Sequence, residues 1–426
     1  MRWFKLIISI LIISAFSQAQ AQDQNTNGKG TKPVIEMQPV IGLQVWSVYT
    51  ISAEIYDESI SQFIPVEDRI NFQLRRSRIG VKGSYGPRLK FNFTAAADLV
   101  GRDALAGTEG GQNNGGFPLL RIWNAWLQWK ALGNSESVNI TFGFFPPRIG
   151  RESMTPALKS PSMEKAWSQN YLRRHLVGTG PGRSVGLNIG GLIQLKKNLA
   201  FDYEAGIFNP ILNESGNATS GSVTGPLLVS RVGIQVGEPE GSKYTLSKTT
   251  NYFGERRGMT VAFAGAYNKG QNAYNDNVAL GIDWLINWDN LHFDGDWTML
   301  SRNPVDTDDK LDAHTGYVRL GYNLVRNNRL IIMPALMYAW FEGATSESLQ
   351  TTASKINFPS GREGMLEASM HFYFDKKYRL TFAYTRRTAD SGEMGPENEI
   401  NNYYSQSGIG PIKRGDWIGA GVVATF

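Results

Sequence analysis

The sequence alternates between apolar residues and polar or small ones from about residue 40 to its C-terminus, and this pattern constrains the fold more than any other feature. In the segment 89–99, for example, every second residue is apolar, and the residues between them include Lys90 and Asn92. A period of two is typical of a β-strand with one apolar face. Most segments are close to the roughly 9–11 residues of a tilted strand that crosses a membrane. We divide the chain into sixteen predicted strands, at residues 40–50, 70–83, 88–99, 120–130, 138–145, 183–191, 199–208, 228–237, 258–267, 277–288, 291–301, 314–323, 329–341, 364–374, 378–387 and 416–426.

The connections between the predicted strands are sorted by length. Counted from the first strand, the odd-numbered connections are long and the even-numbered ones are short, with the exception of 238–257. Short turns at one end and long loops at the other are typical of outer-membrane barrels. The longest strongly apolar run, 330–341, is well short of the roughly 20 residues of a membrane-spanning helix. Because only helices and closed barrels satisfy the backbone in lipid, the sequence predicts an all-β fold, a transmembrane antiparallel β-barrel of about 16 strands.

The N-terminal residues have the pattern of a secretion signal. Arg2 and Lys5 precede an apolar run at 6–16, and Ala19-Gln20-Ala21 provides the small residues that a signal peptidase requires. The chain has no cysteine, which excludes a disulfide framework, a lipoprotein anchor and a thiolate metal site. We therefore predict a protein of the bacterial outer membrane with three segments: a signal peptide at 1–21, a flexible leader at 22–39 and the barrel at 40–426.

Several tryptophans lie near the ends of predicted strands. In a barrel, aromatic residues at these places form girdles at the two membrane–water interfaces. Each tryptophan taken singly fits ordinary core packing equally well. The predicted girdle residues are Trp46, Trp123, Trp129, Trp284, Trp288, Trp340 and Trp417.

The third long connection, 146–182, is strongly basic. It has no convincing helical or strand period, and Pro146-Pro147, Trp167 and Tyr171 give it stiff and aromatic anchors. A long loop without secondary structure in a compact fold is usually functional or disordered. We predict that this loop folds into the pore; the alternative is a solvated loop outside the barrel that touches nothing, or touches anionic lipopolysaccharide. Its acidic residues are Glu152 and Glu164. Its basic residues, counted together with Arg183 at the start of the next predicted strand, are Arg148, Arg151, Lys159, Lys165, Arg173, Arg174 and Arg183.

The predicted lumen face of the strands carries both signs of charge, on different strands. With the apolar face outward, the second and third strands contribute basic residues, and the tenth and eleventh contribute acidic ones. In this register Lys82 lies opposite Lys90, a repulsive pair that water can screen. Patches of Arg and Lys in a pore select for anions. The predicted anion path comprises Arg76, Arg78, Lys82, Lys90, Arg148, Arg151, Arg173, Arg174 and Arg183, and the predicted acidic wall opposite it comprises Asp283, Asp294 and Asp296.

Two stretches carry a family resemblance. One runs Arg75-Arg76-Ser77-Arg78-Ile79-Gly80-Val81-Lys82-Gly83 and is followed by a tight turn and Lys90-Phe91-Asn92. The other, Phe142-Gly143-Phe144-Phe145-Pro146-Pro147, leads towards Ser162-Met163-Glu164 in the third loop. Both resemble the phosphate-selective porin O and P family, in the manner of a Bacteroidetes-like outer-membrane porin. The resemblance implies a homotrimeric porin of 16 strands per chain, whose third loop folds inward and whose arginines and lysines guide anions; it does not imply phosphate selectivity for every member.

Pattern and resemblance together predict a passive channel for small hydrophilic solutes, with a preference for phosphate-like anions. The expected partners are small anionic or polar solutes, outer-membrane lipid and further copies of the chain in a homotrimer. The first alternative is a general diffusion porin, in which the basic loop and the acidic wall create a transverse field without strong selectivity. The alternatives from other functional classes are a barrel enzyme and a surface-binding barrel.

Signals for chemistry are weak. No serine lies in a nucleophile-elbow context, and no glycine-rich phosphate loop precedes a helix. Without cysteine, and with scattered histidines, the sequence predicts no catalytic residues, no metal site and no cofactor. The basic loop accounts for the isoelectric point near 9.1, so nucleic-acid binding is not predicted either. The histidines are His175, His292, His314 and His371.

Overall fold

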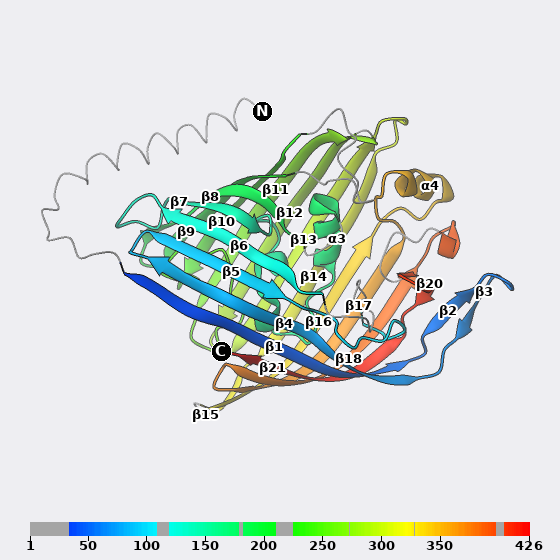
Figure 1. Cartoon of the computed structure of the whole chain (residues 1–426), viewed down its shortest axis with the longest axis horizontal. Coiled ribbons are helices and arrows are strands. Elements are labelled where there is room, and N and C mark those ends of the chain that lie inside the picture. Colours follow the sequence, from blue (N-terminus) through cyan, green and yellow to red (C-terminus); the bar gives the residue numbers. More distant parts are fainter. Residues whose placement is uncertain are drawn as a thin grey trace, which may run out of the picture.

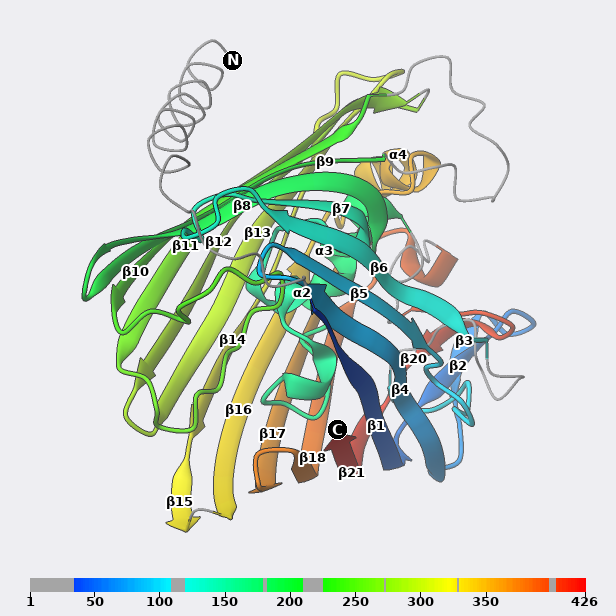
Figure 2. The same ribbon diagram turned by 60° about the vertical axis from the view of Figure 1, so that its left-hand side comes forward.

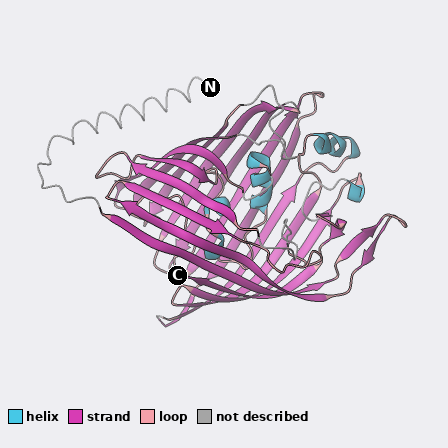
Figure 3. Cartoon of the chain, in the orientation of Figure 1, coloured by secondary structure: helices cyan, strands magenta, loops and turns pink. Residues whose placement is uncertain are grey.

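The computed structural model describes residues 34–108, 119–178, 182–209, 225–271, 273–327, 329–397 and 404–426. These residues form one closed antiparallel β-barrel, as predicted (Figures 1 and 3). The barrel closes because the first strand, β1, pairs both with β4, the next barrel strand, and with the last strand, β21. It has sixteen strands when β14 and β15 are counted as successive parts of one strand, since both pair with β16. None of the described helices is long and apolar enough to cross a membrane.

Each predicted strand overlaps a strand of the barrel. The first one begins earlier than predicted, at Ile35, inside the segment expected to be a leader. The predicted signal peptide and the leader as far as residue 33 lie outside the described residues. The barrel strands are β1 Ile35–Ile51, β4 Arg69–Tyr85, β5 Leu89–Ala96, β6 Arg121–Lys130, β7 Asn139–Phe145, β8 Ser184–Lys196, β9 Leu199–Phe208, β10 Leu227–Gly237, β11 Gly258–Gln271, β12 Tyr274–Trp288, β13 Leu291–Pro304, β14 Leu311–Tyr322, β15 Leu324–Asn327, β16 Leu330–Glu342, β17 Arg362–Phe374, β18 Tyr378–Asp390 and β21 Asp416–Thr425.

The long loops gather at one end of the barrel and carry structure of their own. The first and the last of them build a four-stranded sheet in the order β19-β20-β2-β3, whose β2–β3 hairpin projects beyond the barrel (Figure 1). We call this the long-loop end and the opposite one the short-turn end. The elements outside the barrel wall and the third loop are β2 Glu54–Asp57, β3 Gln62–Pro65, α4 Glu347–Lys355, η2 Gly395–Glu397, β19 Ser405–Gln406 and β20 Gly410–Lys413.

Alternation along each strand separates an apolar outer face from a polar interior. On β5, Phe93 is 51 % exposed on the outside, whereas Thr94 next to it is 2 % exposed and faces inward. Leu, Ile, Val, Phe and Tyr side chains cover the outer face of nearly every strand, while Asn, Gln, Thr, Arg and carboxylates fill the interior. This polarity is the inverse of a soluble sandwich and is what a lipid-facing barrel requires.

Three of the predicted girdle tryptophans point into the barrel instead. Trp129 and Trp288 are exposed on the outside, at 47 % and 61 %, as expected. Trp46 and Trp417 are buried in the interior, where their rings stack with centroids 6.0 Å apart, and Trp123 lines an interior cavity. Alternation along the strand determines whether a side chain faces lipid or the interior. Trp46 lies two residues after the inward-facing Gln44 and therefore also faces inward, although it is near the end of a predicted strand.

The opposite environments of neighbouring β5 residues make a direct test of the lipid-facing surface. Phe93→Arg would place a charge against lipid at a cost of about 2–4 kcal/mol near the midplane, so we expect less folded barrel in the membrane. Asn92→Arg, one residue away on the cavity side, should assemble normally. The measurement is the heat-modifiable gel mobility of the membrane fraction, and equal assembly of the two variants would contradict the assigned faces.

Candidate functional site

The third loop runs inside the barrel and is partly helical, contrary to the prediction of an irregular loop. It contains α2 (Arg151–Met154), η1 (Ala157–Lys159) and α3 (Ser168–Val177), which Figure 2 shows enclosed by the strands. These helices are too short for an apolar period to stand out in the sequence, and tertiary packing stabilises them. The ring of Tyr171 on α3 stacks on Phe341 of β16, with centroids 3.8 Å apart, and its hydroxyl donates to Glu363 at 2.5 Å.

Ion pairs hold the other part of the loop against the same wall. Glu152 pairs with Arg319 of β14 at 3.1 Å and accepts hydrogen bonds from within the loop. Arg319 also pairs with Asp294 of β13 at 2.7 Å. A carboxylate of β17, Glu367, accepts the backbone N–H of Met163 at 2.8 Å. The loop is therefore seated on β13, β14, β16 and β17, and it covers their charged side chains.

This seating changes the predicted role of the acidic wall. Asp283, Asp294 and Asp296 do face inward, but they are buried under the third loop and do not line the interior cavity described below. Asp283 pairs with Arg231 of β10 at 2.8 Å, and Asp296 accepts the N–H of Glu152 at 3.3 Å. Asp283 and Asp294 are paired with arginines, and Asp296 is covered by the backbone of the third loop, so the three do not form an open wall opposite the basic residues.

At its far side the loop reaches β1 and β4 through Glu164. This carboxylate pairs with Arg75 at 2.5 Å and with Arg76. Gln44 of β1 donates to the carbonyl oxygen of Met163 at 3.2 Å. The loop thus spans the barrel from one wall to the other.

Two consecutive arginines can meet one carboxylate because β4 has a β-bulge. Gln44 of β1 pairs with Arg76 and the next residue, Val45, pairs with Leu74, so Arg75 has no partner in the β1–β4 ladder. A bulge inserts one residue and reverses the parity of the strand beyond it. Both Arg75 and Arg76 therefore face inward, whereas strict alternation would have placed Arg75 in lipid. For that reason sequence reasoning left Arg75 out of the candidate site.

The carboxyl of Glu164 remains ionised over a wide pH range. Burial by itself would raise its pKa, but Arg75 and Arg76 outweigh burial and lower the pKa to about 2. A carboxyl with a lowered pKa stabilises the folded loop above its usual pKa, and this contribution is lost as the pH falls towards the lowered value. The contact between loop and wall is therefore retained at neutral and mildly acidic pH.

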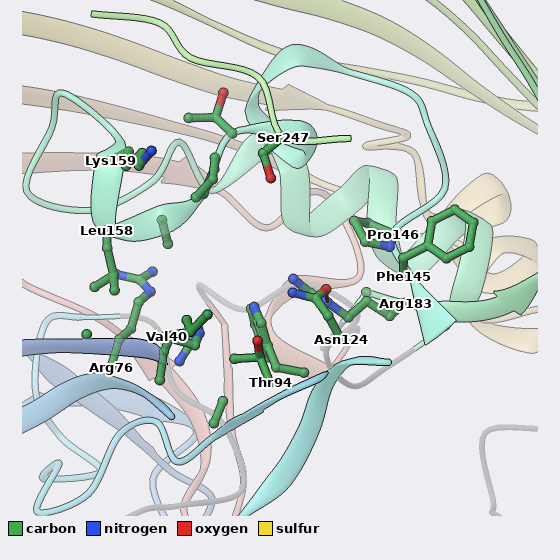
Figure 4. A pocket seen from close by; sticks show the side chains of 18 of the residues that line it. Val40, Arg76, Thr94, Asn124, Phe145, Pro146, Leu158, Lys159, Arg183 and Ser247 are labelled. Carbon is green, nitrogen blue, oxygen red and sulfur yellow. Dashed lines mark hydrogen bonds between the residues drawn. The ribbon is translucent and has the colours of Figure 1, made fainter. Parts of the chain in front are cut away.

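What remains of the lumen is a cavity of about 1490 Å³ between the third loop on one side and β1, β4, β5 and β6 on the other. It extends from residues beside the short turns, such as Lys90 and Lys377, to residues beside the long loops, such as Leu119 and Arg414. Figure 4 shows Lys159 and Arg183 of the loop side and Arg76 of the strand side around it. Its charged lining is strongly one-sided, with fifteen Lys and Arg against the carboxylates Glu36, Asp98 and Glu164.

Eight of the nine residues of the predicted anion path line this cavity: Arg76, Arg78, Lys82, Lys90, Arg148, Arg173, Arg174 and Arg183. The ninth, Arg151, is fully buried away from it and pairs with Glu240 at 2.8 Å and with Asp283 at 3.2 Å. The role of these residues in a constriction stays a prediction. Sequence reasoning did not select the other basic lining residues, which are Arg75, Arg121, Lys159, Lys165, Lys248, Lys377 and Arg414.

Several of the lining arginines have acidic or aromatic partners. Arg78 pairs with Asp98 at 2.5 Å and Arg148 pairs with Glu204 at 3.2 Å. The ring of Trp123 lies between two guanidinium groups, that of Arg78 at 3.9 Å and that of Arg183 at 3.6 Å from its centroid. Such cation–π contacts attract both guanidinium groups to the ring and fix their positions at the cavity wall.

The predicted repulsive pair of lysines is not opposed across the ladder. Lys82 pairs with Asn92, and Lys90 pairs with Ser84, because the turn lies one residue later than assumed, between Tyr85 and Leu89. Lys82 and Lys90 are therefore offset diagonally along the cavity wall, which removes the direct like-charge contact.

A family model for phosphate-selective porin O and P matches residues 56–402 of the sequence. The chain belongs to this family. A search of curated proteins finds no significant match. Among the residues that the structure describes, no group of three or more His, Cys, Asp or Glu is arranged to hold a metal ion.

Solved structures of other proteins share the fold of this porin. The outer membrane channel DcaP of Acinetobacter baumannii is 13 % identical, with 94 % of this chain and 100 % of that chain covered and a TM-score of 0.54. An anion-selective porin from Comamonas acidovorans is 10 % identical, with coverages of 92 % and 100 % and a TM-score of 0.52. Pseudomonas putida OprB is 10 % identical, with coverages of 92 % and 94 % and a TM-score of 0.56.

The contact of Glu164 with two arginines predicts the effect of neutralising it. Glu164→Gln removes one of three carboxylates from the lining of the porin, so the reversal potential in a salt gradient should shift towards anions. Breaking a buried ion pair costs about 3–5 kcal/mol, so the loop should also be held less firmly and the single-channel current should become noisier. Glu36→Gln, at the exposed short-turn end, is the matched control and should have the smaller effect. An equal or larger effect of Glu36→Gln would contradict a central position of Glu164.

Lys165 predicts a dependence on pH. Its ammonium group donates to the carbonyl oxygens of Glu152 and, at 2.9 Å, Thr155. Burial lowers its pKa to about 7, although Glu152 acts in the opposite direction. The side chain is charged below this pH and neutral above it, so anion selectivity should decrease as the pH rises through about 7. Lys165→Met should abolish this change in the reversal potential, whereas Lys82→Met should preserve it; a pH dependence that survives Lys165→Met would exclude this lysine as its origin.

Proposed function

We propose that this porin is a passive diffusion channel of the outer membrane that prefers small anions, phosphate-like oxyanions among them. The observation that carries the proposal is the cavity lining, where fifteen basic residues face three carboxylates along one path through the barrel. Positive side chains along a pore raise the local concentration of anions and lower that of cations. Arginine adds a planar fork that matches oxyanion geometry, and lysine adds a compact point charge.

The distribution of the basic residues supports passage as well as binding. Most of them come from β4, β5, β6 and the third loop, while Lys248, Lys377 and Arg414 come from other connections. They follow the cavity along its length, so no single pocket concentrates them. Conduction requires several weak sites, since one tight site would trap the solute. The burial of Asp283, Asp294 and Asp296 under the loop further favours anions, because these carboxylates do not face the path.

A general diffusion porin is the second candidate. In its favour, several arginines along the path are already paired: Arg76 with Glu164, Arg78 with Asp98, and Arg148 with Glu204. Paired charges attract a passing solute less, so selectivity would be weak. The family match favours a channel over the barrel enzyme and the surface-binding barrel.

We further propose that the chain is secreted through its N-terminal signal, assembles as a homotrimer and contacts outer-membrane lipid through its apolar outer face. The family resemblance supports the trimer, and the exposed Leu, Ile, Val and Phe side chains around the barrel support the lipid contact. A Bacteroidetes-like origin stays a prediction from the resemblance alone.

The sign of the selectivity is tested in planar bilayers. Lys82→Ala combined with Lys90→Ala removes two charges from the cavity wall, and we expect the reversal potential to shift towards cations. The Debye length is about 10 Å at 0.1 M salt and about 3 Å at 1 M, so the shift should be large in dilute salt and small in concentrated salt. Lys376→Ala, beside a short turn but outside the lining, is the control. No anion preference in the wild-type protein at low salt would favour the general porin.

A further inference from the structure

The connection 238–257 breaks the rule that even-numbered connections are short. It joins β10 to β11, and the ends of these strands are already paired, with Gly237 opposite Gly258. A turn of two residues closes such a hairpin. The chain instead inserts a segment that folds back into the barrel from the short-turn end. We call residues 238–257 the inserted segment.

The inserted segment forms part of the cavity wall beside the third loop. Its residues 245–249 line the cavity, and Figure 4 shows Ser247 across it from Thr94 of β5. The N–H of Lys248 donates to the carbonyl oxygen of Met154 in the third loop at 3.1 Å. The solute path is therefore bounded by two inward-folded segments that touch each other.

The segment is also bound to the barrel wall behind it. Tyr244 donates to Glu204 of β9 at 2.5 Å. The side chains of Asn251 and Asn323 donate to each other, at 3.1 and 3.0 Å. The backbone carbonyl of Thr250 accepts from Asn287 of β12 at 3.1 Å. These contacts fix the segment between the third loop and the wall from β9 to β14.

Six charges of alternating sign close a ring through the segment. Lys248 pairs with Asp202 at 2.8 Å, and Asp202 pairs with Arg231 at 2.7 Å. Arg231 pairs with Asp283 at 2.8 Å, and Asp283 pairs with Arg151 of the third loop at 3.2 Å. Arg151 returns to the segment through a bidentate pair with Glu240, at 2.8 and 3.3 Å. The ring links β9, β10, β12 and the third loop to the inserted segment, and it is closed by the stretch of chain between Glu240 and Lys248.

The ring is buried and balanced, with three cations and three carboxylates. Removing one member of a buried ion pair leaves an uncompensated charge and is strongly destabilising. The pKa of Glu240 agrees with this arrangement: burial would raise it, but Arg151 lowers it to about 2. Each member therefore holds its neighbours, and the segment and the third loop stabilise each other.

The barrel wall behind the segment carries more carboxylates than cations, with Asp202, Glu204 and Asp283 against Arg231. Asp202 and Glu204 lie directly against the segment, and Asp283 is linked to it through Arg151, which also pairs with Glu240. These carboxylates lie on the side of the barrel that is filled by the two inward-folded segments, and they do not line the cavity. Without the segment over it, this wall presents Asp202, Glu204 and Asp283 against Arg231, and such an acidic excess attracts cations.

We propose that the inserted segment determines selectivity by closing the acidic side of the barrel, and that its charge ring fixes the third loop so that solutes take only the basic path. Lys248 and Glu240 are positioning residues in this role. The inference deepens the proposed function, since it rests on the basic path being the conducting one.

The decisive variant replaces 238–257 with Asn-Gly, which the pairing of Gly237 with Gly258 allows without disturbing β10 or β11. In planar bilayers the single-channel conductance should rise, and the reversal potential at low salt should shift towards cations. Heat-modifiable mobility of the purified protein confirms that the barrel has formed. A folded barrel with the conductance and the reversal potential of the wild type would overturn the proposal.

Point variants keep the proposal testable if the deletion does not fold. Glu240→Gln breaks the ring at Arg151 and should give the same two changes to a smaller extent, with added current noise from a looser third loop. Glu238→Gln, in the same segment, removes a carboxylate that accepts only the backbone N–H of Arg257 among the described contacts, and it should leave both quantities unchanged. Equal effects of the two variants would overturn the role of the ring.

The wild-type measurement separates the two proposals. If the wild-type porin shows no anion preference, the proposed function fails, yet a higher conductance after the deletion would still support a closed acidic side. If the wild type prefers anions and the deletion changes nothing, the inserted segment does not determine selectivity.

Discussion

The interior of this porin depends on how two carboxylates hold a basic loop. Glu152 binds the third loop to Arg319 on one side of the barrel, and Glu164 binds it to Arg75 and Arg76 on the other. A loop so rich in arginine and lysine would otherwise be repelled by the basic strands that it faces. Its only two acidic residues lie where they offset that repulsion, and the cavity is the space left between these attachments.

The barrel was predictable because lipid imposes a simple rule on every strand. An apolar outside and a polar inside give a period of two, so all sixteen strands were found and most boundaries fell within a few residues of the structure. The interior follows no such rule. Strict alternation failed at Arg75, where a β-bulge reverses the parity, and the position of the turn after Tyr85 changed the partner of Lys90.

Which charges face the solute was harder to predict than which charges face inward. Alternation placed both basic and acidic residues inside, and the structure then separates them by burial. Asp294 and Asp283 form buried ion pairs with arginines of neighbouring strands and of the third loop, whereas Lys82 and Lys90 line the cavity. This sorting depends on contacts between residues far apart in the chain, such as Arg151 with Glu240, which no local pattern reveals.

The stack of Arg78, Trp123 and Arg183 has a consequence for the kinetics of passage. A free arginine side chain loses rotamer freedom whenever it binds, at a cost of about 1.5–2 kcal/mol for the long polar side chains. Here both guanidinium groups already lie against one indole ring, so much of that freedom is lost before any solute arrives. Under the proposed function, a passing oxyanion would meet donors whose orientation is already fixed, so it could bind and leave without a reorganisation of these side chains. Preorganised donors of this kind would therefore allow a short residence time for each bound oxyanion.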